Sequence, residues 1–518
     1  MKKIIKYSTF VLFILLTVLS CDLERRPFNS LASDNALETV SDAQNWDNAF
    51  MDFLRGRSRG IFDHNLEIQS DQYNATVTFG NRQGGVHFWK DFNSSDYDLK
   101  NIFAAYYRGL KNINEFIFRS KQIKPDNDDD QKLLNKYIGD AYFLRAYYYY
   151  QLAMRYGRPY DKSSASKDLS VPLVLVYDYT ALPPRATNEE VYSQIKKDLD
   201  IAKKNLAPYI GSPGSEYINI DVCYAFEARL NLYMGDFPAA LEAAEKVIST
   251  GRYPLVNAAG ESFVDMWHRD KSTEDILTLV VKKPKELANT FFGLYSTMID
   301  KNNPTNPYLC SPDWLPTQTV IDLFSDEDLR KSVYFEKVPM QFNDIFVNDI
   351  YLVSKFKGNK AFADVVNSDM SVWGGYRPTG QHKPKIFRVA EMYLIAAEAA
   401  YKVNDEVTSK KYLKNLMDSR KAGYIDVTGD ALYKQIKEER NRELAFEGFR
   451  LFDLRRYGEG LVRTNPQKSG GNSISHLVNH PSPTNFKISK DDNKWIWGIP
   501  AAEINTNPNI KGHQNPGW

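Results

Sequence analysis

Apolar residues recur every three or four positions in three stretches of the chain, residues 101–121, 131–156 and 189–206. This spacing places them on one face of an α-helix, so we predict a helix over each stretch. The second stretch ends at a glycine shortly before a proline, a typical helix stop. The third is preceded by Thr187, and Glu190 follows three residues later, which is the spacing of a capping box.

Small residues predict two further pairs of helices. Residues 224–254 carry alanines on both sides of Gly235 in the spacing of a tetratricopeptide unit. In such a unit, small side chains let two antiparallel helices approach, and a glycine makes the turn. A comparable pair is predicted over residues 388–403 and 408–421. Its small face consists of Ala390, Ala396, Ala397 and Ala400.

Two long segments, at about 53–100 and 255–385, show no helical period and are rich in glycine, proline and asparagine. Loops of this length in a compact domain are usually functional or disordered. Their aromatic content argues against disorder. We therefore predict a mostly α-helical protein, with helix pairs at about 100–255 and 386–450 and loop-rich segments that carry the functional site.

The first 20 residues have the pattern of a secretory signal. Lysines at positions 2, 3 and 6 precede an apolar run over residues 7–19, which is too short to span ~30 Å of hydrocarbon as a helix. Val18-Leu19-Ser20 before Cys21 is similar to a lipobox. We expect cleavage after residue 20, lipidation of Cys21 and a single mature domain over residues 21–518. A plain signal peptide with an incidental cysteine is the alternative.

Composition narrows the class of function. The chain has 66 basic and 65 acidic residues, a net charge of +1, and no basic tract that would attract nucleic acid. Its 32 Tyr, 29 Phe and 8 Trp amount to 13% of the residues. Many will be core, but this content also supplies flat rings for stacking on ligands. We expect Cys223 and Cys310 to stay unpaired.

The chain lacks the motifs of common catalytic centres. Its seven histidines are scattered, with no H-E-x-x-H pair, and it has no G-x-S-x-G and no phosphate-binding loop. Glu443 and Glu447 could imitate a glycosidase pair, but the neighbouring arginines favour a structural role. No EF-hand spacing supports a structural calcium ion. We predict a protein that is not an enzyme and needs no cofactor.

Residues 440–458 have a helical composition, yet their charges do not keep to one face. Because charged and apolar positions alternate, we predict that carboxylate–guanidinium pairs enter the interior. Pairing partners three or four residues apart would be close enough on a helix. The charged positions of this signature are Arg440, Glu443, Glu447, Arg450 and Asp453.

The signature resembles that of the SusD/RagB family of Bacteroidetes surface lipoproteins, E-R-x-x-E-L-A-F-E-G-x-R-x-x-D-L-x-R-x-G. The ending is similar too, with Ile499-Pro500, Glu503-Ile504 and Asn507-Pro508-Asn509 before Gln514-Asn515-Pro516-Gly517.

This resemblance implies a SusD-like α-helical fold and a lipid anchor at Cys21 in the outer membrane. It also implies exposure at the cell surface, which acidic Asp22 and Glu24 favour. The family's role would be to bind an oligosaccharide and deliver it to a SusC-like TonB-dependent barrel. A RagB-like peptide-binding subunit and a tetratricopeptide surface scaffold without nutrient binding are the alternatives. The sequence does not decide between glycan and peptide.

A sugar site needs aromatic rings beside planar polar side chains, and both loop-rich segments offer this combination. The family places ligand-contacting aromatics in corresponding loops, but loop sequences vary too much for transfer by residue. Our ligand-binding candidates in the first segment are Asp71, Tyr73, Asn74, Arg82 and Trp89. In the second segment they are Tyr295, Trp314 and Trp373. Trp89 and Trp314 are the leading candidates, although core packing would explain any one of these residues.

Overall fold

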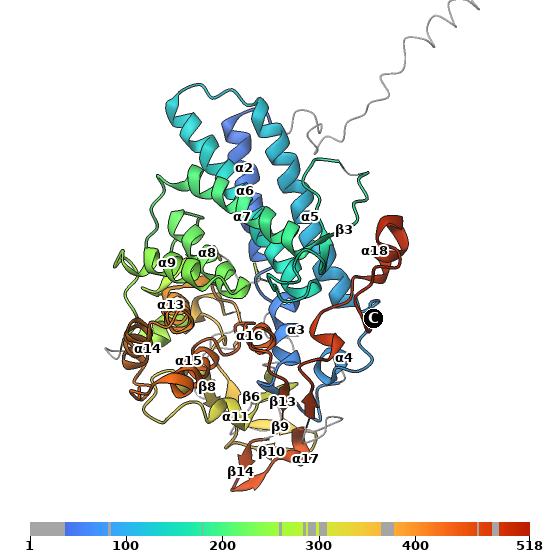
Figure 1. Cartoon of the computed structure of the whole chain (residues 1–518). Helices are drawn as coiled ribbons and strands as arrows, with labels where there is room; N and C mark the ends of the chain where they lie inside the picture. The colour runs from blue at the N-terminus through green and yellow to red at the C-terminus, as the bar shows by residue number, and fades with distance from the viewer. Residues whose placement is uncertain are drawn as a thin grey trace, which may run out of the picture.

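Helices dominate the architecture and gather at one end of the molecule (Figure 1). The computed structural model describes residues 37–80, 84–178, 180–257, 262–282, 286–287, 297–299, 308–363, 378–463, 466–478 and 486–518. The longest helices are α2 (Val40–Arg55), α5 (Tyr97–Arg119), α6 (Asp128–Tyr156) and α7 (Asn188–Leu206). The predicted helices over 101–121, 131–156 and 189–206 are thereby confirmed. Within the described residues, no helix combines the length and the apolarity that crossing a membrane requires.

Helix α6 is the centre of this bundle, because α2, α5 and α7 all pack against it. Its second half is covered on every side, and four consecutive tyrosines, residues 147–150, are all buried there. Arg145 of α6 forms a buried bidentate ion pair with Asp198 of α7, at 2.8 and 2.7 Å. At the start of α7, Thr187 and Glu190 form the predicted capping box.

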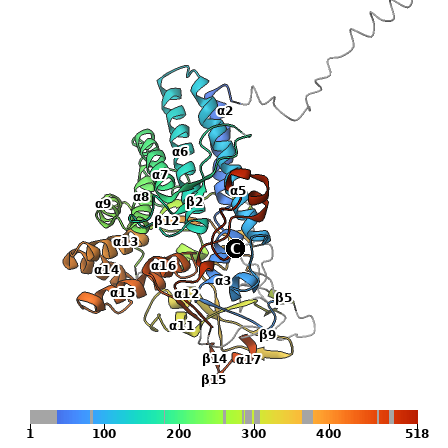
Figure 2. The same ribbon diagram turned by 45° about the vertical axis from the view of Figure 1, so that its right-hand side comes forward.

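Two antiparallel helix pairs continue the helical part. They are α8 (Ile220–Met234) with α9 (Phe237–Ile248), and α13 (Val389–Lys402) with α14 (Glu406–Arg420). Gly235 makes the first turn in the left-handed conformation (φ +72°), as the tetratricopeptide pattern predicts. Helix α9 packs on α13, so the two pairs are neighbours, as Figure 2 shows. The predicted helix pairs are therefore present.

Most of the small sheets lie at the other end of the molecule, around α11, whereas Figures 1 and 2 show β2, β3 and β12 among the helices. One sheet has four strands in the order β10-β9-β6-β5, and the other described sheets are two-stranded. The strands are β1 (Tyr73–Ala75), β2 (Leu169–Pro172), β3 (Arg185–Thr187), β4 (Asp275–Thr278), β5 (Thr297–Ile299), β6 (Tyr308–Cys310), β7 (Trp314–Pro316), β8 (Phe335–Lys337), β9 (Met340–Phe342), β10 (Ile345–Val347), β11 (Tyr351–Val353), β12 (Lys385–Arg388), β13 (Leu461–Arg463), β14 (Lys468–Ser469), β15 (Asn472–Ser473) and β16 (Phe486–Ile488).

Short helices complete the loop-rich segments and the C-terminal part. They are α3 (Ile61–Gln69), α4 (Gly84–Phe88), α10 (Ser262–His268), α11 (Gln318–Ile321), α12 (Lys331–Tyr334), α17 (Ser475–Val478) and α18 (Ala501–Thr506). Single 3₁₀ turns lie at Ser120–Gln122, Lys360–Phe362, Asn493–Trp495 and Pro508–Ile510.

The signature segment is not one continuous helix. Helix α15 (Gly429–Glu443) ends at Glu443 of the signature, and α16 (Arg450–Tyr457) begins seven residues later. Between them Phe446 (φ +66°) and Gly448 (φ +80°) adopt left-handed conformations, which a helix does not tolerate. The helical spacing across this break was therefore misleading.

The C-terminal segment folds back over the N-terminal helices, and the C-terminus lies beside α3 and α4 (Figure 1). The amide of Trp497 donates to the carbonyl of Arg155, and Asn515 Nδ2 donates to the carbonyl of Tyr156. Arg185 Nη1 donates to the carbonyl of His513. These bonds cap the end of α6 with residues from the end of the chain.

Candidate functional site

Antiparallel pairing of β1 with β7 brings the two candidate ligand segments together. Tyr73 lies opposite Pro316 and Ala75 opposite Trp314. The contact continues beyond the strands, because the amide of Thr76 donates to the carbonyl of Asp313 at 2.9 Å. Segments about 240 positions apart in the sequence thus share one small sheet.

The aromatic candidates of this sheet are covered by protein. Tyr73 is 0% exposed and Trp314 is 1% exposed. The ring of Trp314 packs 4.6 Å from that of His87, and Trp89 packs on Trp495 and donates from Nε1 to the carbonyl of Gln69. All three rings belong to the core in this structure, so their contact with a ligand stays a prediction.

The polar candidates have partners inside the protein. Asp71 accepts two hydrogen bonds from Arg450, at 2.9 and 2.7 Å, which ties the first candidate segment to the signature. Asn74 is buried in β1. Arg82, Tyr295 and Trp373 lie outside the described residues, as does Cys21.

An exposed aromatic ring that the sequence analysis did not single out lies in the second loop-rich segment. Phe346 of β10 is 59% exposed, next to Ile345, which is 45% exposed. Both follow the two-residue turn Asn343–Asp344 that joins β9 to β10. An Asn-Asp pair between short apolar runs is a hairpin signal and would have placed these residues at a projecting tip.

The signature carboxylates lie in a buried charge network. Glu443 accepts hydrogen bonds from three arginines: Arg330 (2.8 Å), Arg388 (2.8 Å) and Arg420 (3.1 Å). All four side chains are at most 2% exposed. Although burial alone would favour the neutral acid, these guanidinium groups hold the pKa of Glu443 well below its ordinary value.

The network extends to equal numbers of positive and negative side chains. Its carboxylates are Glu274, Asp328, Glu439, Glu443 and Glu447, and its cations are Arg330, Lys355, Arg388, Arg420 and Arg442. The prediction that ion pairs of the signature enter the interior is confirmed. The partners of Glu443 and Glu447 come from distant segments. Glu439 and Asp453, by contrast, also pair with Arg442 and Arg456 three residues away on the same helix.

Burial in this network also disfavours the charged form of Lys355. Its Nζ donates to Glu447 Oε1 at 2.7 Å and to the carbonyl of Ala445 at 2.8 Å. Burial nevertheless lowers the pKa of Lys355 to about 7. A second buried pair joins Arg440 to Asp453 at 2.8 Å. These contacts form a structural network. In it, Glu443 and Glu447 are engaged by arginine and lysine partners, as the structural role predicted for them requires.

Neither the cysteines nor the acidic residues form a metal centre in the described part of the chain, where no group of three metal-binding side chains is found. Cys223 and Cys310 are both buried and do not pair with each other, as expected.

Comparisons with known proteins match both ends of the chain. The family model described as "SusD family" matches residues 351–518, and the one described as "Starch-binding associating with outer membrane" matches residues 33–232. SusD-like protein P2 of Formosa agariphila is 23% identical over 567 residues, covering 99% of this chain and 100% of the relative. SusD-like protein P38 of the same organism is 23% identical over 504 residues, covering 90% and 92%.

Solved structures share the fold. A SusD superfamily protein from Bacteroides thetaiotaomicron superimposes with a TM-score of 0.72 at 23% identity, covering 92% of this chain and 100% of that one. A putative sugar binding protein from Bacteroides vulgatus gives a TM-score of 0.72 at 22% identity, covering 93% and 100%. The matched signature, the two family models and relatives that span the whole chain make this protein similar to SusD-like proteins along its length.

Proposed function

We propose that this protein binds a glycan at the cell surface and hands it to a SusC-like TonB-dependent transporter in the outer membrane. The observation that carries the proposal is the match of residues 33–232 to the family described as starch-binding and associating with the outer membrane. Relatives with this fold from Bacteroides vulgatus are described as a putative sugar binding protein and a SusD-like carbohydrate binding protein. The protein acts by binding, and Cys21 carries the lipid anchor.

The strand-rich end of the molecule supports this role as the ligand face. The β1–β7 sheet joins the middle parts of the two loop-rich segments. Phe346 adds an exposed ring on the β9–β10 hairpin, which suits stacking on the C–H face of a sugar. Trp89 and Trp314 are buried, and a ligand would reach them only if the covering residues moved.

Binding of the soluble protein, residues 22–518, to a panel of oligosaccharides and peptides tests the proposal. Isothermal calorimetry should show saturable binding to one class of glycan. Phe346→Ala should weaken that binding, whereas Phe118→Ala should not, since Phe118 is similarly exposed (51%) but lies on α5 in the helical part. Saturable binding to peptides alone would move the protein to a peptide-import role. A ligand bound equally well by both variants would exclude the hairpin from the site.

The anchor and the transporter need a separate test in the native organism. Metabolic labelling with a fatty acid should mark the wild-type protein and not a Cys21→Ser variant. The anchored protein should co-purify with a large outer-membrane β-barrel. Co-purification with a surface hydrolase in place of a barrel would contradict the import role.

A further inference from the structure

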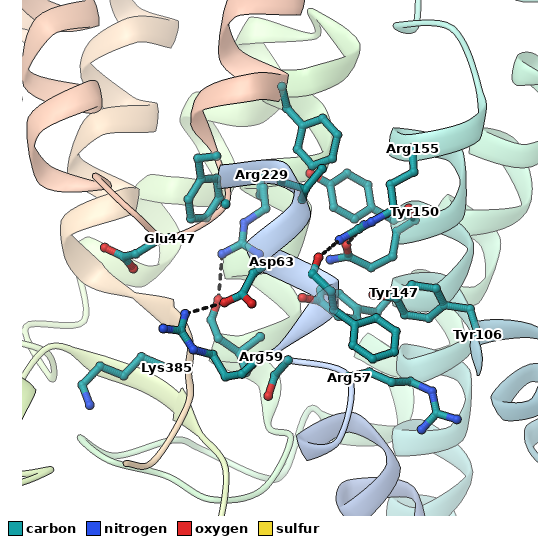
Figure 3. Close-up of a pocket in the computed structure, with 18 of the residues that line it drawn as sticks. Arg57, Arg59, Asp63, Tyr106, Tyr147, Tyr150, Arg155, Arg229, Lys385 and Glu447 are labelled. Carbon is teal, nitrogen blue, oxygen red and sulfur yellow. Dashed lines mark hydrogen bonds and ion pairs between the residues drawn. The ribbon is translucent and has the colours of Figure 1, made fainter. Parts of the chain in front are cut away.

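A cavity of about 100 Å³ lies where the helical bundle, the stacked helix pairs and the signature segment meet. Its wall includes the start of α3, the second half of α6, part of α8, and the break between α15 and α16. Cationic side chains outnumber carboxylates in this wall (Figure 3). The cations are Arg57, Arg59, Arg155, Arg229 and Lys385, and the carboxylates are Asp63 and Glu447.

Two of the arginines have a carboxylate of their own. Arg59 Nη1 lies 2.7 Å from Asp63 Oδ2, so this pair is neutral as a unit. Arg229 Nη2 lies 2.6 Å from Glu391, which stands behind the cavity wall on α13.

The remaining carboxylate of the wall adds no free negative charge. Glu447 already accepts hydrogen bonds from Arg388 at 2.6 Å and from Lys355 at 2.7 Å. Lys385 lies 3.5 Å from Asp270 and 3.7 Å from Asp275. Both wall residues therefore have oppositely charged partners without the cavity.

Arg155 and Arg57 differ, because no described carboxylate pairs with either. Arg155 is 4% exposed, and it donates to the carbonyls of Gln151 and Phe62 and to the Gln151 side chain. Arg57 donates to the carbonyls of Phe53 and Ala105. A buried cation without a counterion is costly. This cost applies to Arg155, since Arg57 is only half-buried, and both residues line the cavity.

Carbonyl-bound arginines elsewhere in the molecule are more completely satisfied. Every side-chain nitrogen of Arg185 has an acceptor, and the same holds for Arg463. In Arg155, by contrast, Nε has no partner. The cavity is the feature that distinguishes the surroundings of Arg155 from those of Arg185 and Arg463.

The unsatisfied groups of the cavity wall are all of one kind. Among its described residues, three keep a buried side-chain atom without a hydrogen bond: Arg59 Nε, Arg155 Nε and Trp267 Nε1. Each is a donor, and no described wall residue leaves a buried acceptor unpaired. The wall thus calls for an acceptor with negative charge.

We propose that this cavity binds one small oxyanion, of the size of acetate, sulfate or phosphate, beside Arg155 and Arg57. The volume sets this limit, because a cavity of about 150 Å³ accommodates benzene. A space of about 100 Å³ accepts a small ion with its waters and excludes a whole monosaccharide. The site is independent of the proposed glycan face, since the exposed Phe346 is not part of its wall.

Calorimetric titration with sodium sulfate, in sodium chloride of matched ionic strength, tests the proposal. We expect one saturable site per chain. Arg155→Gln should weaken binding by about tenfold or more, because a charge-assisted hydrogen bond is lost. Arg185→Gln is the matched control, since Arg185 is also buried and carbonyl-bound but lies outside the cavity wall; it should leave the affinity unchanged.

Parallel titrations with acetate and glucuronate test the size limit. Acetate should bind and glucuronate should not; tighter binding of glucuronate would overturn the proposal. So would the absence of saturable heat with sulfate, which would leave the cavity to water, or equal affinities in wild type and Arg155→Gln. If Arg155→Gln does not fold, Arg57→Gln decides by the same criterion.

Discussion

The carboxylate of Glu443 is fully buried, so its negative charge is stabilised by its arginine partners and not by water. Each of the three guanidinium groups also contacts another carboxylate, so the charges form a closed set. In such a set the net gain over an apolar core is small, but the loss of one member leaves buried charges uncompensated. Replacing a single charged residue of the signature should therefore lower the stability strongly.

Glu443→Gln should lower the free energy of unfolding by about 3–5 kcal/mol, because three buried arginines lose their common counter-charge. Glu242→Gln is the control, since Glu242 is 70% exposed and pairs with Lys246 on the surface of α9. An exposed pair of this kind contributes about 0–1 kcal/mol. Urea denaturation of both variants measures the difference. Equal costs would contradict a special role for the network.

Trp314→Ala should lower the free energy of unfolding by about 3–5 kcal/mol, because it empties a fully covered site between His87 and Phe79. Phe346→Ala should change it by less than about 0.5 kcal/mol, since this ring is mostly in water. Thermal unfolding of the two variants checks the contrast. A Trp314→Ala protein of wild-type stability would show that the ring does not support the core.

Three histidines with lowered pKa values, His87, His268 and His382, predict a loss of stability in acid. Burial lowers the pKa of His87 and His382 well below the usual value and that of His268 to about 3. Below about pH 6.5 the unfolded chain takes up protons that the folded histidines refuse. The free energy of unfolding should therefore fall with decreasing pH, by about 1.4 kcal/mol per unit for each such histidine.

Chemical denaturation between pH 7 and 5 measures this dependence. In His268→Gln the slope should decrease by the contribution of one histidine, whatever the buried carboxylates add to both proteins. An unchanged slope in the variant would contradict a neutral His268 in the folded protein.

At the scale of elements, glycine allows the close contact between α5 and α6. A Cβ on Gly109 would lie 2.5 Å from Cε2 of Tyr148, which is itself fully buried. Because Tyr148 is 1% exposed, its ring would have to shift within the core to make room. The approach of these two helices thus depends on one missing methyl group.

Gly109→Ala should destabilise the protein even though alanine favours a helix by about 1 kcal/mol over glycine. Gly56→Ala, at the end of α2, is the control, because its Cβ would meet only ordinary contacts of 3.6 Å or more. Differential scanning calorimetry should show a lower melting temperature for Gly109→Ala alone. A rise in both variants would mean that Tyr148 moves aside at little cost.

Helix ends that are determined by capping and turn residues could be predicted from the sequence. The capping box at Thr187 and the turn at Gly235 mark helix ends where the structure has them. The break after Glu443 was not predictable in this way, because its apolar spacing continues across residues in left-handed conformation. The chain leaves the helix here, and Glu447 then contacts Arg388 and Lys355, which lie far away in the sequence.

At the scale of the whole molecule, the candidate site was only partly predictable. The segments around Tyr73 and Trp314 were predicted as two separate candidates, and β1–β7 pairing makes them neighbours. Core packing was an open alternative for each ring, and aromatic content alone does not reveal which rings are covered by distant segments. The partners of Glu443 could not be read either, since Arg330 and Arg388 lie 113 and 55 positions away.

The return of the last residues to the end of α6 has a consequence for the time course of synthesis. Asn515 and its partner Tyr156 are 359 positions apart. At about 5–20 residues per second, the ribosome needs roughly 20 to 70 seconds to make the intervening chain. During that interval the carbonyls at the end of α6 lack their final cover, so the first half of the protein completes its packing only when the last residues have emerged.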